Sequence, residues 1–142
     1  MINNNKPPIQ SSQTMAVAAS ALKAQQARMR VIAENIANAD STGKTAGADP
    51  YRRQTPVFTS AKVDGATGVK LAAVTPDMKP FQSVYDPSHP AADAQGYVKK
   101  PNVDPLIETM DMREAQRAYE ANINVIETSR SMTQKVLDIL QK

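Results

Sequence analysis

The fold is decided by residues 102–142, which read NVDPLIETMDMREAQRAYEANINVIETSRSMTQKVLDILQK. Apolar side chains recur here with a seven-residue period, which is typical of a helix that packs against other helices. The first apolar edge of this helix consists of Met112, Tyr119, Ile126, Thr133 and Leu140, together with Ala115, Asn122, Ser129 and Val136. Two more edges run beside it, made of Ile123 and Leu137 and of Ala118, Val125, Met132 and Ile139. The apolar stripe therefore spans about half of the circumference, which is more than one partner helix covers.

The start of this helix is marked by Asp104 and Pro105. Aspartate supplies an N-cap oxygen, and a proline in the first turn needs no partner for a missing N–H group. Glu108 falls one residue too late for a capping box. At about 1.5 Å per residue, roughly 36 residues make a rod about 54 Å long. We therefore predict one long C-terminal helix within residues 102–142.

A second seam helix is predicted over residues 15–41. Its seven-residue repeat consists of Met15, Leu22, Met29 and Ile36, with Ala18, Ile32 and Ala39 three residues after three of them. Gln25 interrupts the apolar series, and many alanines favour helix and allow a partner backbone to approach closely. The helix is expected to end in residues 38–43, which are turn and C-cap formers. Residues 1–14, rich in Asn, Gln, Ser and Pro, are predicted to form a disordered leader.

Residues 42–101 are predicted to form a β-rich insertion and an extended connection. Short β-prone runs predict strands at 57–63, 69–75 and 82–85, with turns at Asp64-Gly65 and at Thr67-Gly68. The fold class is thus mainly α with a small β insertion. The two long terminal helices are expected to pack antiparallel as a coiled-coil-like hairpin that flanks this short β-rich segment.

Composition limits the classes of function. The 142 residues include no cysteine and no tryptophan, so helix seams rather than an aromatic core must provide the packing, and thiol chemistry is excluded. Residues 103–142 carry five Lys/Arg against seven Asp/Glu, whereas a nucleic-acid binder would concentrate basic residues on such a helix. We expect no nucleic acid partner. The sequence also contains no run long enough to span a bilayer and no apolar core of a signal peptide, so no membrane insertion is expected.

No catalytic, cofactor-binding or metal site is predicted. His89 is the only histidine, and no cysteine or suitably spaced carboxylate accompanies it. Gly43-Lys44-Thr45 lacks the upstream glycine of a phosphate-binding loop. Tyr51-Arg52-Arg53 is a basic cluster that could contact a phosphate, although a solvated turn or a protein interface is its usual fate. The protein is therefore predicted not to be an enzyme.

Four residues of the first edge carry polar groups, namely Tyr119, Asn122, Ser129 and Thr133. Tyr119 is expected to pack in the seam with its hydroxyl at the edge. Asn122 and Ser129 are more informative, because a polar residue at a seam position costs stability and commonly fixes the register or the partner of a helix.

Several motifs resemble those of one protein family. They are Val31-Ile-Ala-Glu-Asn-Ile-Ala-Asn-Ala39, Pro50-Tyr-Arg-Arg53, Gly96-Tyr-Val-Lys99, Pro101-Asn-Val103 and Arg117-Ala-Tyr-Glu-Ala-Asn122. Together with shorter matches they cover the chain from about Met15 to Leu140. The chain resembles the FlgC family of flagellar basal-body rod proteins, within the wider family of rod and hook axial proteins.

The resemblance implies a structural subunit of the proximal rod of the bacterial flagellum. Such a subunit would be exported by the flagellar type III apparatus without a cleaved signal peptide and would lie in the periplasm. It would assemble with itself and with other rod proteins, through a rod core domain made of helices 15–41 and 102–142, into a helical axial structure that transmits torque. The assembly interface is expected to comprise Leu22, Met29, Ile32, Ile36, Tyr119, Asn122, Ile123, Ile126, Met132, Val136, Leu137 and Leu140.

The alternative is a soluble helical adaptor or export chaperone that binds a partner helix in the broad stripe. A rod subunit adds to its neighbours open-endedly through a heterologous contact, whereas an adaptor closes into a small complex.

Overall fold

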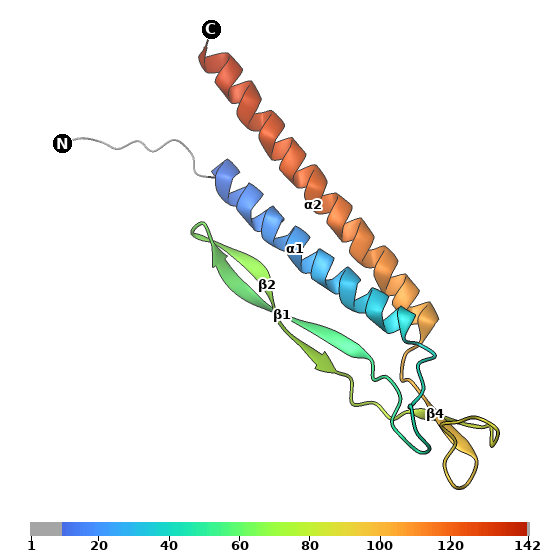
Figure 1. The fold of residues 1–142 in the computed structure, drawn as a ribbon. Coiled ribbons are helices and arrows are strands. Elements are labelled where there is room, and N and C mark those ends of the chain that lie inside the picture. The colour runs from blue at the N-terminus through green and yellow to red at the C-terminus, as the bar shows by residue number, and fades with distance from the viewer. Residues whose placement is uncertain (1–9, 142) are drawn as a thin grey trace.

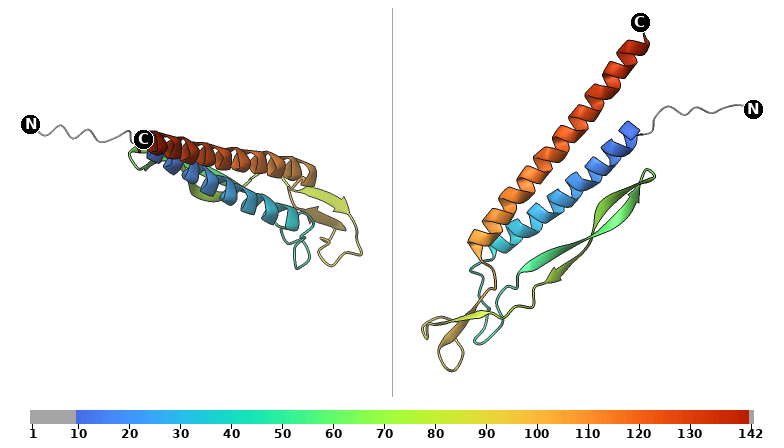
Figure 2. Two further views of the ribbon diagram at one scale, coloured as in Figure 1. Left: turned by 90° about the horizontal axis from the view of Figure 1, so that it is seen from above. Right: turned by 180° about the vertical axis from the view of Figure 1, so that it is seen from behind.

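The computed structural model describes residues 10–141. The elements are α1 (Gln10–Ala37), β1 (Gln54–Val63), β2 (Ala66–Pro76), β3 (Gln82–Tyr85), β4 (Tyr97–Lys100) and α2 (Pro105–Leu140). The molecule is elongated: α1 lies between α2 on one side and the β1–β2 hairpin on the other (Figures 1 and 2). The prediction of two long helices that flank a β-rich segment is confirmed.

The start of α2 is capped as the sequence predicts. Asp104 Oδ1 accepts hydrogen bonds from the backbone N–H groups of Leu106 (2.9 Å) and Ile107 (3.4 Å). Pro105 occupies the first turn, where its missing N–H costs nothing. The cap therefore fixes where the long helix begins.

The first helix is displaced from its predicted bounds at both ends. It begins at Gln10 rather than Met15, so the predicted disordered leader is wrong for residues 10–14, and its residues 1–9 lie outside the described part of the chain. Tertiary contacts stabilise the first turn: Ser12 Oγ donates to Asp64 Oδ2 (2.9 Å), and Gln13 Nε2 donates to the carbonyl of Asp64 (3.2 Å). The helix ends at Ala37, four residues before the predicted residue 41, because the chain turns at residues 38–40.

The β1–β2 hairpin closes at one of the two predicted turns. Asp64 and Gly65 have φ angles of 50° and 81°, as a two-residue hairpin turn requires, so this turn is confirmed. The turn predicted at Thr67-Gly68 is wrong, because both residues lie within β2. Gly68 instead marks a close approach to α1, since a Cβ atom there would lie 2.5 Å from Ser20 Oγ. That hydroxyl accepts a hydrogen bond from the backbone N–H of Val69 (3.2 Å) and ties the hairpin to α1.

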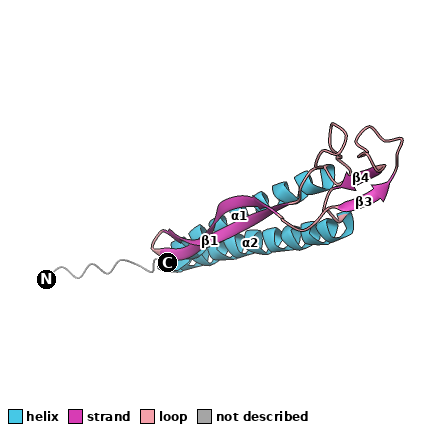
Figure 3. Cartoon of the chain, turned by 90° about the horizontal axis from the view of Figure 1, so that it is seen from below, coloured by secondary structure: helices cyan, strands magenta, loops and turns pink. Residues whose placement is uncertain are grey.

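The second sheet combines one predicted strand with one that the sequence did not reveal. β3 has its predicted bounds and pairs antiparallel with β4, which we expected to be an extended connection. A run of four residues beside prolines is too short to show an alternating pattern. Val98 in β4 is nevertheless buried. This sheet lies at the end of the helix pair away from the C-terminus (Figure 3).

The two helices contact each other along most of α1. Ser129 Oγ donates to the carbonyl of Ser11 (3.3 Å), Gln26 Nε2 to the hydroxyl of Tyr119 (3.4 Å), and Asn35 Nδ2 to Glu108 Oε2 (3.2 Å). Residue numbers therefore rise along α1 as they fall along α2. The buried apolar residues are Ala18, Ala24, Val31, Ile32, Ala91, Val98 and Ala115. Neither helix in the described part of the chain is apolar enough to cross a membrane.

Candidate assembly interface

The first predicted edge of α2 faces α1. Ala115 is completely buried and Ser129 nearly so, while Asn122 between them is half-buried. These positions are spaced by seven residues, which keeps them on one side of the helix. The small side chains at these positions let the two backbones approach closely.

The twelve predicted interface residues divide into two groups. Eight are buried or half-buried within the chain, namely Leu22, Met29, Ile32, Ile36, Tyr119, Asn122, Ile123 and Ile126. Four are exposed, namely Met132, Val136, Leu137 and Leu140. The division follows the length of α1, because Ser11, in its first turn, lies beside Ser129 and α2 continues for about three turns beyond that point (Figure 1).

Residues 130–140 of α2 project past α1 and form the uncovered end of this helix. Met132 is 64% exposed, Ile139 73% and Leu140 76%. Burying a side chain of this kind contributes about 1.5–3 kcal/mol. Contiguous exposed apolar surface of this kind marks a contact with another protein.

Sequence reasoning missed a second exposed apolar group at the other end of α2. Leu106, Ile107 and Met110 are all more than half exposed. Ile107 precedes Val125 by eighteen residues, or about five helical turns, so both lie on the same face. The third predicted edge did not reveal this surface, because its seven-residue repeat extends back to Asp111 and Asp104.

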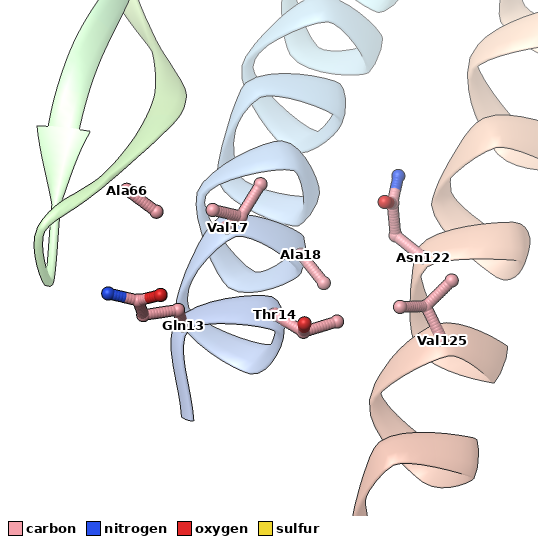
Figure 4. A pocket seen from close by; sticks show the side chains of 7 residues that line it. All are labelled: Gln13, Thr14, Val17, Ala18, Ala66, Asn122 and Val125. Atoms are coloured by element: carbon pink, nitrogen blue, oxygen red, sulfur yellow. The ribbon is translucent and has the colours of Figure 1, made fainter. Parts of the chain in front are cut away.

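An open groove lies where α1, α2 and the hairpin tip meet (Figure 4). Its volume is about 460 Å³, and it is lined by Gln13, Thr14, Val17, Ala18, Ala66, Asn122 and Val125. Thr14 and Ala18 point toward α2, and Asn122 and Val125 point toward α1. Asn122 Nδ2 donates to the carbonyl of Ala118 in its own helix (2.8 Å).

The half-buried Tyr51-Arg52-Arg53 cluster holds the chain together internally. Arg52 donates to the carbonyls of Asp77 (3.0 Å) and Lys79 (3.1 Å) and stacks 4.1 Å above the Phe81 ring. Arg53 pairs with Glu108, and the Tyr51 hydroxyl donates to Asn35. The partners lie far away along the sequence, so the local pattern of the cluster could not identify them.

His89 has a local structural role. Its Nδ1 atom accepts a hydrogen bond from the backbone N–H of Ala91 (3.0 Å) within a turn. Among residues 10–141, no group of three or more His, Cys, Asp or Glu side chains is placed to hold a metal ion.

A terminal helix pair with an exposed apolar end is typical of a subunit that packs against other proteins. Comparisons with known proteins agree with this class. A family model described as "Flagella basal body rod protein" matches residues 15–43, and another, "Flagellar basal body rod FlgEFG protein C-terminal", matches residues 94–139.

Individual relatives resemble the chain over most of its length. It is 49% identical over 127 residues to the flagellar basal-body rod protein FlgC of Agrobacterium fabrum, which covers 88% of this chain and 91% of that protein. It is 45% identical over 130 residues to FlgC of Salmonella typhimurium (88% and 94%) and 40% identical over 140 residues to FlgC of Bacillus subtilis (87% and 93%). The chain belongs to the FlgC family of flagellar basal-body rod proteins.

Membership confirms the resemblance drawn from the sequence and makes this chain a structural protein of the flagellar basal-body rod. The relatives are rod proteins rather than enzymes. The adaptor or export-chaperone alternative is therefore not favoured.

Proposed function

We propose that this rod subunit assembles through its terminal helices, packed antiparallel as a coiled-coil-like hairpin, into a helical axial structure that transmits torque. The observation that carries the proposal is the uncovered end of α2, where four of the predicted interface residues are exposed. An apolar helix end that residues 10–141 do not cover is available for a neighbouring subunit.

The two groups of predicted interface residues take different roles in this proposal. The eight buried or half-buried residues hold the subunit's own helices together. Met132, Val136, Leu137 and Leu140 bind neighbouring subunits. In a rod that grows open-endedly this contact is heterologous, so the uncovered end binds a different surface of the next subunit.

The partners are further copies of this chain and other rod proteins. We further propose that the chain reaches the periplasm through the flagellar type III export apparatus without a cleaved signal peptide, as family membership suggests. Mass spectrometry of the chain in purified basal bodies tests this part: an N-terminal peptide that starts at Met1 or Ile2 is expected, and a start further along the chain would contradict it.

Substitution of Met132 tests the interface. Met132→Asp places a charge on the uncovered end. Assembly would bury this charge without a partner, which is costly. We therefore expect normal export, but no rods in purified basal-body preparations and no motility. Ser131→Asp is the matched control, because it adds the same charge at the neighbouring exposed position on the polar face. Both purified proteins should keep wild-type helicity in circular dichroism. Normal rods with Met132→Asp would show that the uncovered end is not an interface.

A further inference from the structure

A buried polar cluster lies where α1, α2 and the start of β1 meet. Glu108 is completely buried and Asn35 is 1% exposed. The Glu108 carboxylate accepts hydrogen bonds from Arg53 Nε (2.5 Å) at one oxygen and from Asn35 Nδ2 (3.2 Å) at the other. Burial alone would lower the pKa of Arg53, but the bonded Glu108 carboxylate raises it above its ordinary value, so the guanidinium stays charged.

Further bonds tie this cluster to the middle of the chain. Asn35 Oδ1 accepts from the Tyr51 hydroxyl (2.8 Å) and from the backbone N–H of Gln54 (2.8 Å). Asn102 Oδ1 accepts from the backbone N–H of Arg53 (2.7 Å). Every polar group of the Asn35 side chain thus has a partner, and the partners come from two separate segments, residues 51–54 and α2.

The apolar seam by itself does not define this arrangement. Positions spaced by seven residues on the α1-facing side of α2 are occupied by Glu108, Ala115, Asn122, Ser129 and Val136. Sliding α2 by seven residues, about 10 Å, would put Ala115 beside Asn35 and Val136 beside Ser11. Val136 would then be covered at the place that Ser129 holds now, Ser129 would take the place of Asn122, and Glu108 would leave the seam, which is an apolar gain. Asn35 would lose its bond to Glu108 and keep those with Tyr51 and Gln54. Arg53, whose side chain is 24% exposed, would lose its nearest carboxylate, Glu108, and keep only the longer pair with Asp77 (3.5 Å). Removing the closest partner of a largely buried charge costs more than one ordinary bond contributes.

We propose that Asn35, Arg53 and Glu108 form a register lock that decides which residues of α2 are covered by α1. A buried polar group with complete bonding specifies one alignment of two helices, as a single buried asparagine does in coiled coils. The lock leaves residues 130–140 uncovered. That these residues then bind a neighbouring subunit rests on the proposed function, but the lock itself concerns the isolated chain.

Cysteine cross-linking reads the register directly, because the chain contains no cysteine of its own. Oxidation of purified Ser11→Cys/Ser129→Cys protein should form an intramolecular disulfide, since these residues adjoin in the structure. Ser11→Cys/Val136→Cys should not. Both pairs are then placed in a background in which the carboxylate is moved by one repeat, Glu108→Ala/Ala115→Glu.

In that background the lock predicts that the 11/136 pair forms the disulfide and the 11/129 pair does not. The ratio of the 11/136 yield to the 11/129 yield should rise at least tenfold, and both proteins should remain helical. Persistence of the 11/129 disulfide would overturn the lock and show that the connection through residues 101–104 sets the register. Loss of both disulfides together with helicity would also overturn it, because the lock predicts a folded, shifted pair.

Asp111→Ala is the matched control, since Asp111 also pairs with Arg53 (3.8 Å) but is partly exposed. Asp111→Ala should leave the yield of the 11/129 disulfide unchanged. A shift to the 11/136 disulfide as large as that in the Glu108→Ala/Ala115→Glu protein would overturn the lock. These measurements need no assembly. A chain with the native register that nevertheless forms no rods would speak against the proposed function alone.

Discussion

At the scale of single residues, Tyr51 couples the folded state to pH. Burial raises the pKa of Tyr51 above its ordinary value of 10.0, and the nearby carboxylates of Glu34 and Glu108 act in the same direction. Its hydroxyl donates to Asn35 Oδ1, which a phenolate cannot do. The raised pKa means that the folded chain holds this proton more tightly than the unfolded chain.

This contribution to the free energy of unfolding is complete below the unfolded pKa, about 10, and is lost as the pH rises through the folded value. We therefore expect stability, measured by urea unfolding, to fall as the pH rises above about 10, and Tyr51→Phe to remove part of that fall. Tyr85→Phe serves as the control, because Tyr85 is mostly exposed. Equal pH slopes for wild type and Tyr51→Phe would contradict the assignment.

Arg28 illustrates a residue whose ion pairs contribute little. It reaches Asp111 (3.9 Å) and Glu114 (3.6 Å) across the two helices, and the Glu114 side chain is 70% exposed. Exposed pairs contribute about 0–1 kcal/mol, so Arg28→Gln should change stability by less than 1 kcal/mol and leave motility intact. Loss of motility in a swarming assay, with normal protein levels, would mean that charge and not the apolar stripe determines assembly.

Residue roles were predictable only where the signal was local. The Asp104 cap follows from two adjacent residues. Glu108 was dismissed as a failed capping box, yet it falls seven residues before Ala115 and hence on the covered side of α2. Its partners, Asn35 and Arg53, lie 73 and 55 residues away, and no single-sequence pattern connects them.

At the scale of elements, α2 was the most predictable part of the fold. Its repeat spans many turns and its cap is unambiguous. The start of α1 was not predictable, because Ser12 and Gln13 have ordinary helix propensities and their helical state depends on contacts with Asp64 in the hairpin turn. β4 was missed because four residues are too few for a periodic pattern. Elements with long repeats were therefore predictable, whereas the start of α1 and the short strand β4 depend on tertiary contacts that the sequence pattern does not show.

Ile126 tests the covered side of α2. Ile126→Asp introduces a charge at a half-buried position of the first edge, so we expect the free energy of unfolding to fall by roughly 1–3 kcal/mol and rods not to form. Glu127→Gln, at the adjacent exposed position, should change stability by less than about 0.5 kcal/mol. Urea unfolding and motility assays measure both effects. If the two variants behaved alike, the assigned register of the seam would be wrong.

At the scale of the whole molecule, the chain is divided into a tied end and an uncovered end. The cluster around Glu108 holds the region where α2 begins, and the β1–β2 hairpin packs on α1 (Figure 1). Toward the C-terminus, α2 loses these contacts beyond Ser129. The sequence predicted a stripe too broad for one partner, but it could not show where along α2 the coverage stops, because that depends on the register of the two helices.

This division predicts a gradient of amide protection along α2 in the isolated subunit. Amides from Ala115 to Ser129 adjoin buried side chains, so their opening requires the helices to separate, and we expect slow hydrogen exchange there. Amides of residues 130–140 open by local fraying at little cost, and we expect fast exchange. In assembled basal bodies the same residues should become protected by at least tenfold, because neighbouring subunits cover them. Exchange measured by mass spectrometry on both samples decides the matter: strong protection of residues 130–140 in a verified monomer, or no gain on assembly, would show that this end does not await a neighbour.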